Sequence, residues 1–309
     1  FWDTNAVLTS IDTSSSITLN VTDDAVFNAV FTSTPYVGRL SVSELNYHSD
    51  NTRDAGDWIE LHNYGNGVLD ISGWKITDGV IYHNYVFPAG TLLQPGSRLV
   101  VAEDTMKFHS QHPGINVFSQ FGFGLNNATE SVSIYDYTGE PALSFHYEDS
   151  IPWPQAADGF GRTLELYADS LDPALPESWF EGCIGGSPGG PYVNCPEELR
   201  FSEINYNSSP VADAGDWVEL FNTGSTAIDI SGWIFSDEED THLFSIPNGT
   251  ILLPSGYFVL FSDSVKFISR FPAVSNKSGP FAFGLNNNSD AIRLFDGAGR
   301  LYLSVIYSS

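Results

Sequence analysis

The chain has 309 residues, with 38 Asp and Glu against 12 Lys and Arg, a formal net charge of −26 and 42% hydrophobic residues. A surface this acidic repels phosphate backbones, so we predict no nucleic acid partner. The apolar content is enough to build packed cores, which excludes a disordered chain. No run of about 18 apolar residues occurs, so no transmembrane segment is predicted.

Short β-rich runs bounded by Gly, Pro, Asn or Asp follow one another along the chain and predict strands. They cover residues 40–47, 58–63, 98–102, 132–136, 257–262 and 291–296. Regular short strands are typical of an antiparallel sandwich or barrel. Only two brief helices are expected, at 105–112 and 264–271, because each follows an Asp that can cap its first turn and precedes a Pro.

An internal duplication is the clearest feature of the sequence. Motifs of the first half return 159 residues later, or 160 beyond one inserted residue. The matched segments are 57–61 with 216–220, 70–74 with 229–233, and 123–127 with 283–287. We therefore predict two copies of one domain, at 39–148 and 199–309, joined by a Pro- and Gly-rich connector at 149–198.

These motifs carry a resemblance to a known family. Asp-Trp-Ile/Val-Glu-Leu-x-Asn, Asp-Ile-Ser-Gly-Trp and Phe-Gly-Leu-Asn-Asn, in this order in both copies, are similar to the bacterial lamin-tail domain. The resemblance implies an all-β chain of two tandem immunoglobulin-like β-sandwiches in a secreted or surface protein. It also implies that residues 1–36 are a short β-rich fragment, the C-terminal part of a small β-repeat domain. Residues 149–198 are similar to the extension that commonly follows such domains.

The two cysteines, Cys183 and Cys195, both lie in the connector. A zinc site would need further ligands, and no Cys-x-x-Cys or clustered His accompanies them. We favour a disulfide, with two free thiols as the alternative. A disulfide indicates an oxidising compartment, so the expected location is extracellular or at the cell surface. The start at Phe1, without a Met or an apolar signal segment, is interpreted as a mature product or an excised fragment.

Recurrent carboxylates form the main candidate metal site. Oxygen ligands from adjacent strands and a loop suit calcium, a hard cation that binds several oxygens. The candidate ligands are Glu44, Asn46, Asp57 and Glu60 in the first copy and Glu203, Asn205, Asp216 and Glu219 in the second. The alternative is that Glu60 and Glu219 satisfy backbone groups or pair with Arg39 and Arg200.

Two motifs resemble a catalytic site and a metal-binding site. The segment 185–189 satisfies the G-x-S-x-G pattern of serine hydrolases, but Pro188 has no N–H for an oxyanion hole, so a turn-rich linker is favoured. His109 and His112 could bind a metal on a short helix. The second copy has Ile268 and Phe271 at these positions, which favours a solvated surface pair.

Other polar and aromatic features have simpler interpretations. The acidic run 237–240 is not matched as a run in the first copy, so we interpret it as a solvated loop rather than part of the shared design. Repeated tryptophans are expected in the core rather than as sugar platforms. They are Trp58, Trp74, Trp217 and Trp233. Glycosylation triplets begin at Asn20, Asn127, Asn207, Asn248, Asn276 and Asn287.

Three functional classes remain. The leading hypothesis is a non-catalytic structural, adhesion or assembly module of a larger secreted or cell-surface bacterial protein, so no enzyme is expected. The second is a calcium-assisted module that binds surface glycans or proteins. The third is the accessory region of an enzyme. Resemblance suggests a CotH-like kinase domain upstream, and no catalytic part of such a kinase is in this sequence. Other domains of the same polypeptide are the first expected partners.

Overall fold

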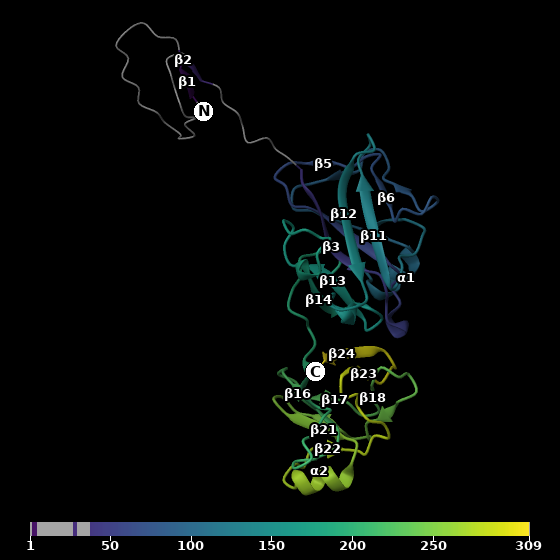
Figure 1. Ribbon diagram of the computed structural model, residues 1–309, viewed down its shortest axis with the longest axis vertical. Coiled ribbons are helices and arrows are strands. Elements are labelled where there is room, and N and C mark those ends of the chain that lie inside the picture. The colour runs from purple at the N-terminus through teal and green to yellow at the C-terminus, as the bar shows by residue number, and fades with distance from the viewer. Residues whose placement is uncertain (1, 5–26, 30–37, 309) are drawn as a thin grey trace, which may run out of the picture.

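The computed structural model describes residues 2–4, 27–29 and 38–308 (Figure 1). Over this part the chain consists mainly of strands and loops, which confirms the all-β prediction. Strands β1 (Trp2–Thr4) and β2 (Phe27–Ala29) pair antiparallel. The other residues of the predicted fragment 1–36 lie outside the described residues. No described helix is long and apolar enough to cross a membrane.

The first sandwich packs a six-stranded sheet against a four-stranded sheet, whose order is β12-β11-β6-β7. The six-stranded sheet has the order β10-β9-β4-β3-β13-β14, in which β13 (Arg162–Leu166) and β14 (Trp179–Ile184) come from the connector. A short pair, β5 with β8, completes it. The elements up to residue 148 are β3 (Leu40–Asn46), η1 (Asn51–Arg53), β4 (Trp58–Asn63), β5 (Leu69–Asp70), β6 (Lys75–Thr77), β7 (Tyr85–Val86), β8 (Leu92–Leu93), β9 (Arg98–Ala102), α1 (Thr105–Gln111), β10 (Val117–Gln120), β11 (Thr129–Tyr135) and β12 (Pro141–Glu148).

The second sandwich repeats this plan with sheets ordered β15-β16-β21-β22 and β19-β18-β23-β24, and a short pair β17 with β20. Its elements are β15 (Leu199–Asn205), β16 (Trp217–Asn222), β17 (Ile228–Asp229), β18 (Ile234–Ser236), β19 (Phe244–Ser245), β20 (Ile251–Leu252), β21 (Tyr257–Phe261), α2 (Ser264–Arg270), β22 (Lys277–Ser278), β23 (Ser289–Phe295) and β24 (Leu301–Ser308). Strand β15 is the terminal strand of its sheet, whereas its counterpart β3 is an inner strand.

The connector accounts for this difference. It is not only an extended link, because two of its strands join the first sheet beside β3. Its side chains Trp153, Leu164 and Trp179 enter the core of the first sandwich. The connector elements are η2 (Gln155–Ala157), β13 (Arg162–Leu166), η3 (Pro176–Ser178) and β14 (Trp179–Ile184).

A β-bulge decides which side chains of β3 reach the core. The register with β4 shifts between Val42 and Glu44. Because an extra residue reverses the alternation of faces, Val42, Leu45 and Tyr47 all enter the core and are 0% exposed. Glu44 is left on the opposite, outer face. Strand β15 has the same shift, between Phe201 and Glu203.

A smaller cluster lies under each helix, as the tryptophan prediction requires. Trp58 is 0% exposed and meets Phe108 of α1 edge to face, with ring centroids 5.8 Å apart. Trp217 repeats this contact with Phe267 of α2 at 6.0 Å. Trp233 is also buried and Trp74 is partly buried against the main core. The helices begin at the predicted Asp caps and end one residue earlier than predicted.

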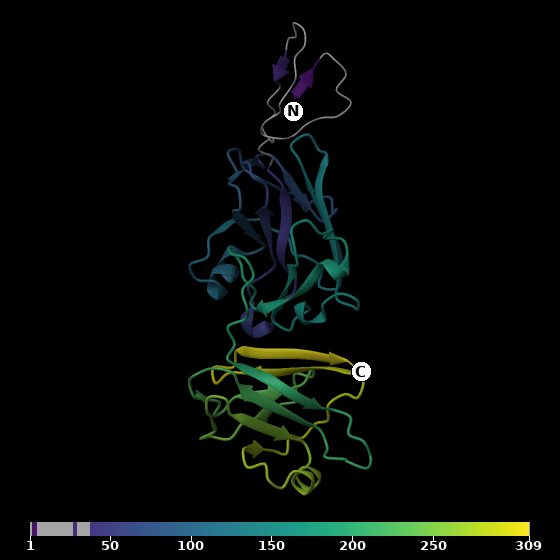
Figure 2. The same ribbon diagram turned by 90° about the vertical axis from the view of Figure 1, so that its left-hand side faces the viewer.

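The two sandwiches lie end to end, with β24 of the second facing the first (Figures 1 and 2). Both backbone groups of Leu301 are bound by the first sandwich, its N–H by Thr52 Oγ1 at 2.8 Å and its carbonyl by Arg53 Nε. Ser304 Oγ donates to the carbonyl of Phe160 at 2.7 Å. The open edge of β24 is therefore partly covered, which is how proteins protect such edges.

Candidate functional site: a carboxylate row under the connector

Three glutamates stand side by side across three neighbouring strands of the first sandwich. Glu60 on β4 is the register partner of Glu44 on β3, and Glu44 is the register partner of Glu165 on β13. All three residues are buried, and at most 4% of their surface is exposed. Like charges directly opposite each other on adjacent strands repel, so this carboxylate row requires compensation.

Glu60 is compensated by one cation and two further donors. Arg98 Nη1 donates to Glu60 Oε1 at 2.7 Å, and Ser43 Oγ donates to the same oxygen at 2.6 Å. The backbone N–H of Gly189 donates to Oε2. The expected backbone contact of Glu60 is present, but its cationic partner is Arg98 rather than Arg39, because β9 places Arg98 on the same outer face.

The connector supplies the donors for the rest of the row. Glu44 Oε1 accepts hydrogen bonds from Thr163 Oγ1 at 2.7 Å and from the backbone N–H of Ser187 at 2.9 Å. The hydroxyl of Ser187 donates to Glu165 Oε1 at 2.9 Å. Ser187, the serine of the G-x-S-x-G pattern, thus holds two carboxylates and has no histidine among these partners.

Burial changes the protonation of the row. It raises the pKa of Glu44 well above its ordinary value, and the charge of Glu165 raises that pKa further. Burial also raises the pKa of Glu165 to about 7, while hydrogen bonds from Ser187 and with Glu44 act in the opposite direction. Burial and the neighbouring carboxylates therefore favour the protonated form of Glu44, which lowers the repulsion within the row.

Close packing requires glycine at position 186 of the segment 185–189. A Cβ on Gly186 would lie 2.1 Å from Glu44 Oε1 and 2.8 Å from Thr163 Cγ2. Gly186 also has a φ of 78°, in the region that disfavours other residues. Only glycine at position 186 therefore lets the covering segment lie this close to Glu44.

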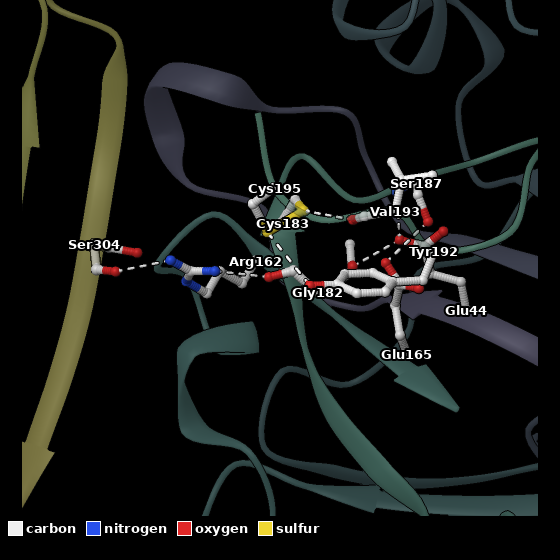
Figure 3. The surroundings of a disulfide bond; sticks show 11 residues. Glu44, Arg162, Glu165, Gly182, Cys183, Ser187, Tyr192, Val193, Cys195 and Ser304 are labelled. Carbon is white, nitrogen blue, oxygen red and sulfur yellow. Dashed lines mark hydrogen bonds between the residues drawn. A yellow bond between two sulfur atoms is a disulfide. The ribbon is translucent and has the colours of Figure 1, made fainter. Parts of the chain in front are cut away.

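A disulfide closes the covering loop. Cys183 and Cys195 are bonded, with Cα atoms 5.2 Å apart, which confirms the predicted bridge. Figure 3 shows the bridge between the contact of Arg162 with Ser304 and the contacts of Ser187 with the carboxylate row. The bridge thus lies between the row and the junction of the two sandwiches.

The second sandwich has the acids of the row without its cover. Glu203 and Glu219 are register partners, and Ser202 Oγ donates to Glu219 Oε1 at 2.8 Å. Glu203 is exposed. Among the described residues neither glutamate forms an ion pair, so the pairing of Glu219 with Arg200, one of the alternatives to calcium binding, is absent. Tyr257 occupies the position that corresponds to Arg98.

Comparison with family models identifies both sandwiches. The model of the lamin tail domain matches residues 33–149 and 195–309, well over half of the chain. The chain belongs to the lamin tail domain family. A search of curated proteins found no match. Glu165 of the carboxylate row and the connector residues that bind the row, Thr163 and Ser187, lie outside both matched lamin tail domains.

The remaining calcium candidates lie at other contacts shared by the two lamin tail domains. Asp57 Oδ2 accepts from the backbone N–H of Leu125 at 2.7 Å, and Asp216 accepts from Leu285 at 2.9 Å. Burial raises the pKa of Asp57 to about 7. The amides of Asn46 and Asn205 donate to the carbonyls of residues 56 and 215, at 2.7 Å in each domain.

The structure does not bring the candidate ligands of either lamin tail domain into one cage. Among the described residues, the one group of three His, Cys, Asp or Glu side chains with ligand atoms within 4.8 Å of one another is Cys183, Cys195 and Glu197. Its two sulfurs are already bonded to each other. Calcium binding at the predicted residues stays a prediction.

Two expectations about polar residues are wrong in part. His112 is not a solvated residue: its ring lies 4.8 Å from that of Phe108, and burial lowers its pKa to about 4. His109 is exposed as expected. Asp237 belongs to the shared design, since its Oδ2 lies 2.8 Å from His242 Nδ1 and repeats the pair of Asp78 with His83.

The Asp–His pairs were missed although a signal was present. Both residues of the pair recur at the spacing of 159. In each lamin tail domain the histidine ring stacks on a phenylalanine, with centroids 5.0 Å apart for His83 and Phe123 and 5.1 Å for His242 and Phe283. In the acidic run, Asp240 also pairs with the buried Arg293 at 2.9 Å. The run is therefore partly structural.

Proposed function

We propose that this chain is a non-catalytic, rigid tandem module that acts as a spacer and serves structure, adhesion or assembly in a larger secreted or cell-surface bacterial protein. The observation that carries this proposal is that the carboxylate row binds the connector. Hydrogen bonds that Ser187 donates to the row hold the connector against the first sandwich. The connector in turn contacts β24 of the second sandwich. Ser187, the serine of the G-x-S-x-G pattern, makes the contact with the row.

The junction supports rigidity because the contacts come from both the first sandwich and its connector. Thr52 and Arg53 bind the backbone of Leu301, and Arg162 Nη2 donates to the carbonyl of Ser304 at 3.2 Å. A Cβ on Gly161 would lie 2.6 Å from Leu301 Cδ2, so the surfaces fit closely. The disulfide supports an oxidising location outside the cytoplasm.

Distance measurement between spin labels tests rigidity. Labels at Met106→Cys and Val265→Cys would use two exposed helix positions, one in each lamin tail domain, with the native disulfide kept. We expect one narrow distance distribution that broadens in the double variant Thr52→Ala, Arg53→Ala. The matched control Thr138→Ala, Arg39→Ala changes the same residue types away from the junction. A broad distribution in the unmodified chain would contradict the spacer role.

Carbohydrate binding is a second candidate, favoured by one groove of about 540 Å³ on the first sandwich. Tyr167 and Tyr192 line it, are 64% and 41% exposed, and flank Phe180 with ring centroids 4.7 and 4.9 Å away. Arg98 and Asp169 add polar groups to the lining. A glycan screen tests it: binding that Tyr167→Ala abolishes would favour this role, and no binding would remove it.

An association with a CotH-like kinase domain rests on the sequence resemblance alone. It predicts phosphotransfer by a longer polypeptide and none by residues 1–309. Phosphotransfer by this chain alone would contradict the non-catalytic proposal.

A further inference from the structure

We propose that the outer face of β15 and β16 is a docking surface for an extended, glycine-rich segment of a partner protein that carries a basic side chain. The segment would pair with the edge of β15 and present backbone N–H groups to Glu203 and Glu219. The inference goes beyond the spacer role, which depends on the junction at β24 and not on this face.

The first sandwich shows what such a face holds when it is covered. There β13 pairs with β3, Thr163 and the N–H of Ser187 bind Glu44, and the N–H of Gly189 binds Glu60. The acceptors are retained in the second copy as Glu203 and Glu219 on β15 and β16. Among the described residues, no strand pairs with the outer edge of β15.

The apolar side of β15 is also incompletely covered. Val42, Leu45 and Tyr47 on and after β3 are 0% exposed, because Trp153, Leu164 and Trp179 of the connector complete their core. Their counterparts Phe201, Ile204 and Tyr206 are only partly buried. An unpaired edge with apolar side chains readily accepts an added strand, and main-chain hydrogen bonds then supply the affinity.

Charge complementarity selects a basic segment. In the first copy Arg98 pairs with Glu60, whereas Tyr257 stands at that position in the second and stacks on Phe221 with centroids 4.4 Å apart. Tyr257 is 48% exposed. An incoming Lys or Arg can therefore approach two carboxylates and lie against an aromatic surface, which is a favourable environment for a cation.

The probe is a synthetic peptide of residues 158–190 with Cys183→Ala, in which Glu165→Lys places a cation opposite Glu203. We expect this peptide to bind the full chain at least tenfold more tightly than the same peptide with Glu165 retained. Hydrogen exchange should show new protection of the β15 amides. Binding should fall at least tenfold in Glu203→Gln, Glu219→Gln, whereas Glu177→Gln, a change at an exposed acid elsewhere, should leave it unchanged.

Four outcomes would overturn the proposal. They are equal binding of the two peptides, binding without protection of β15, dimerisation of the chain that Glu203→Gln abolishes, and calcium binding that the same variant abolishes. The third would assign the face to a second copy, and the fourth to a cation. Because the spin-label experiment measures the β24 junction, failure here would leave that test of the spacer role independent.

Discussion

The backbone N–H of Ser187 lies 2.9 Å from Oε1 of Glu44, a residue 143 positions earlier in the chain. This contact gives the buried acid of β3 a hydrogen-bond donor and places the glycine-rich run of the connector against the first sheet. Each would be costly alone, because a buried carboxyl needs donors and a glycine-rich segment loses much entropy on ordering. Together they fix the cover of the first sheet.

Gly186→Ala is expected to destabilise the first sandwich by about 2 kcal/mol or more, from the clash with Glu44 and the positive φ. Urea unfolding would measure the change. Gly190→Ala is the matched control, because its Cβ would have no neighbour closer than 4.0 Å. The control should stay within about 0.5 kcal/mol of the original chain. Equal effects of both changes would contradict the close packing at Glu44.

The stabilisation that Glu165 contributes should fall as pH rises from 4.5 towards 7, whereas His112, whose pKa burial lowers to about 4, contributes with the opposite sign. The pKa of Glu165 rises from 4.5 to about 7 on folding, so the folded state binds more protons in this window. The stabilisation is complete below the unfolded value and is lost as pH rises through the folded one. Chemical unfolding at several pH values should show a loss on the order of 2 kcal/mol in the original chain relative to the variant Glu165→Gln.

Glu165→Gln should remove the contribution of Glu165 from the pH dependence of stability and leave the contributions of other groups. Burial also raises the pKa of Asp57, to about 7, so Asp57 contributes to the pH dependence of stability with the same sign as Glu165. Glu177→Gln, which changes an exposed acid, should leave the slope unchanged. An unchanged slope in Glu165→Gln would show that Glu165 ionises normally in the folded chain.

Removing the disulfide with Cys183→Ser, Cys195→Ser should release the covering loop. In the chain-entropy account, a disulfide that closes a loop of this length stabilises the folded state by about 3 kcal/mol. Hydrogen exchange should increase at residues 185–192 and remain unchanged in β21 of the second sandwich. If the exchange of residues 185–192 stays the same, the hydrogen bonds to the carboxylate row suffice to hold the loop.

Trp179→Ala should destabilise the first lamin tail domain by about 3–5 kcal/mol, although Trp179 lies outside the residues that match the family. The side chain is 3% exposed and belongs to the main core. Tyr167→Ala, at a residue 64% exposed, is the control and should cost little. Thermal unfolding that is equal in the two variants would show that the connector is not part of this core.

The duplication made much of the fold predictable. Motifs repeated at one spacing identified two related units, and period-two patterns located their main strands. Asp104 and Asp263 marked the helix starts because an Asp cap acts on N–H groups within its own first turn. The family resemblance also followed from these local motifs, and the match to the lamin tail domain agrees with it.

The site was only partly predictable. Glu44 and Glu60 were singled out because they recur, but Glu165 occurs once and gave no repeat signal. Its alternation with Leu164 and Leu166 was compatible with a strand. No local pattern could state that this strand would pair with β3, since strand pairing depends on contacts between residues more than a hundred positions apart.

By itself the sequence determined the all-β class, the two copies and the helix caps, because these depend on periodicity and on interactions between near neighbours. Tertiary structure alone decided that the connector belongs to the first sandwich and that Ser187 binds Glu44 and Glu165. It also decided that the equivalent glutamates of the second sandwich stay uncovered. The physical reason is that one acidic motif was repeated, while the long-range hydrogen bonds that neutralise it formed in only one of the described copies.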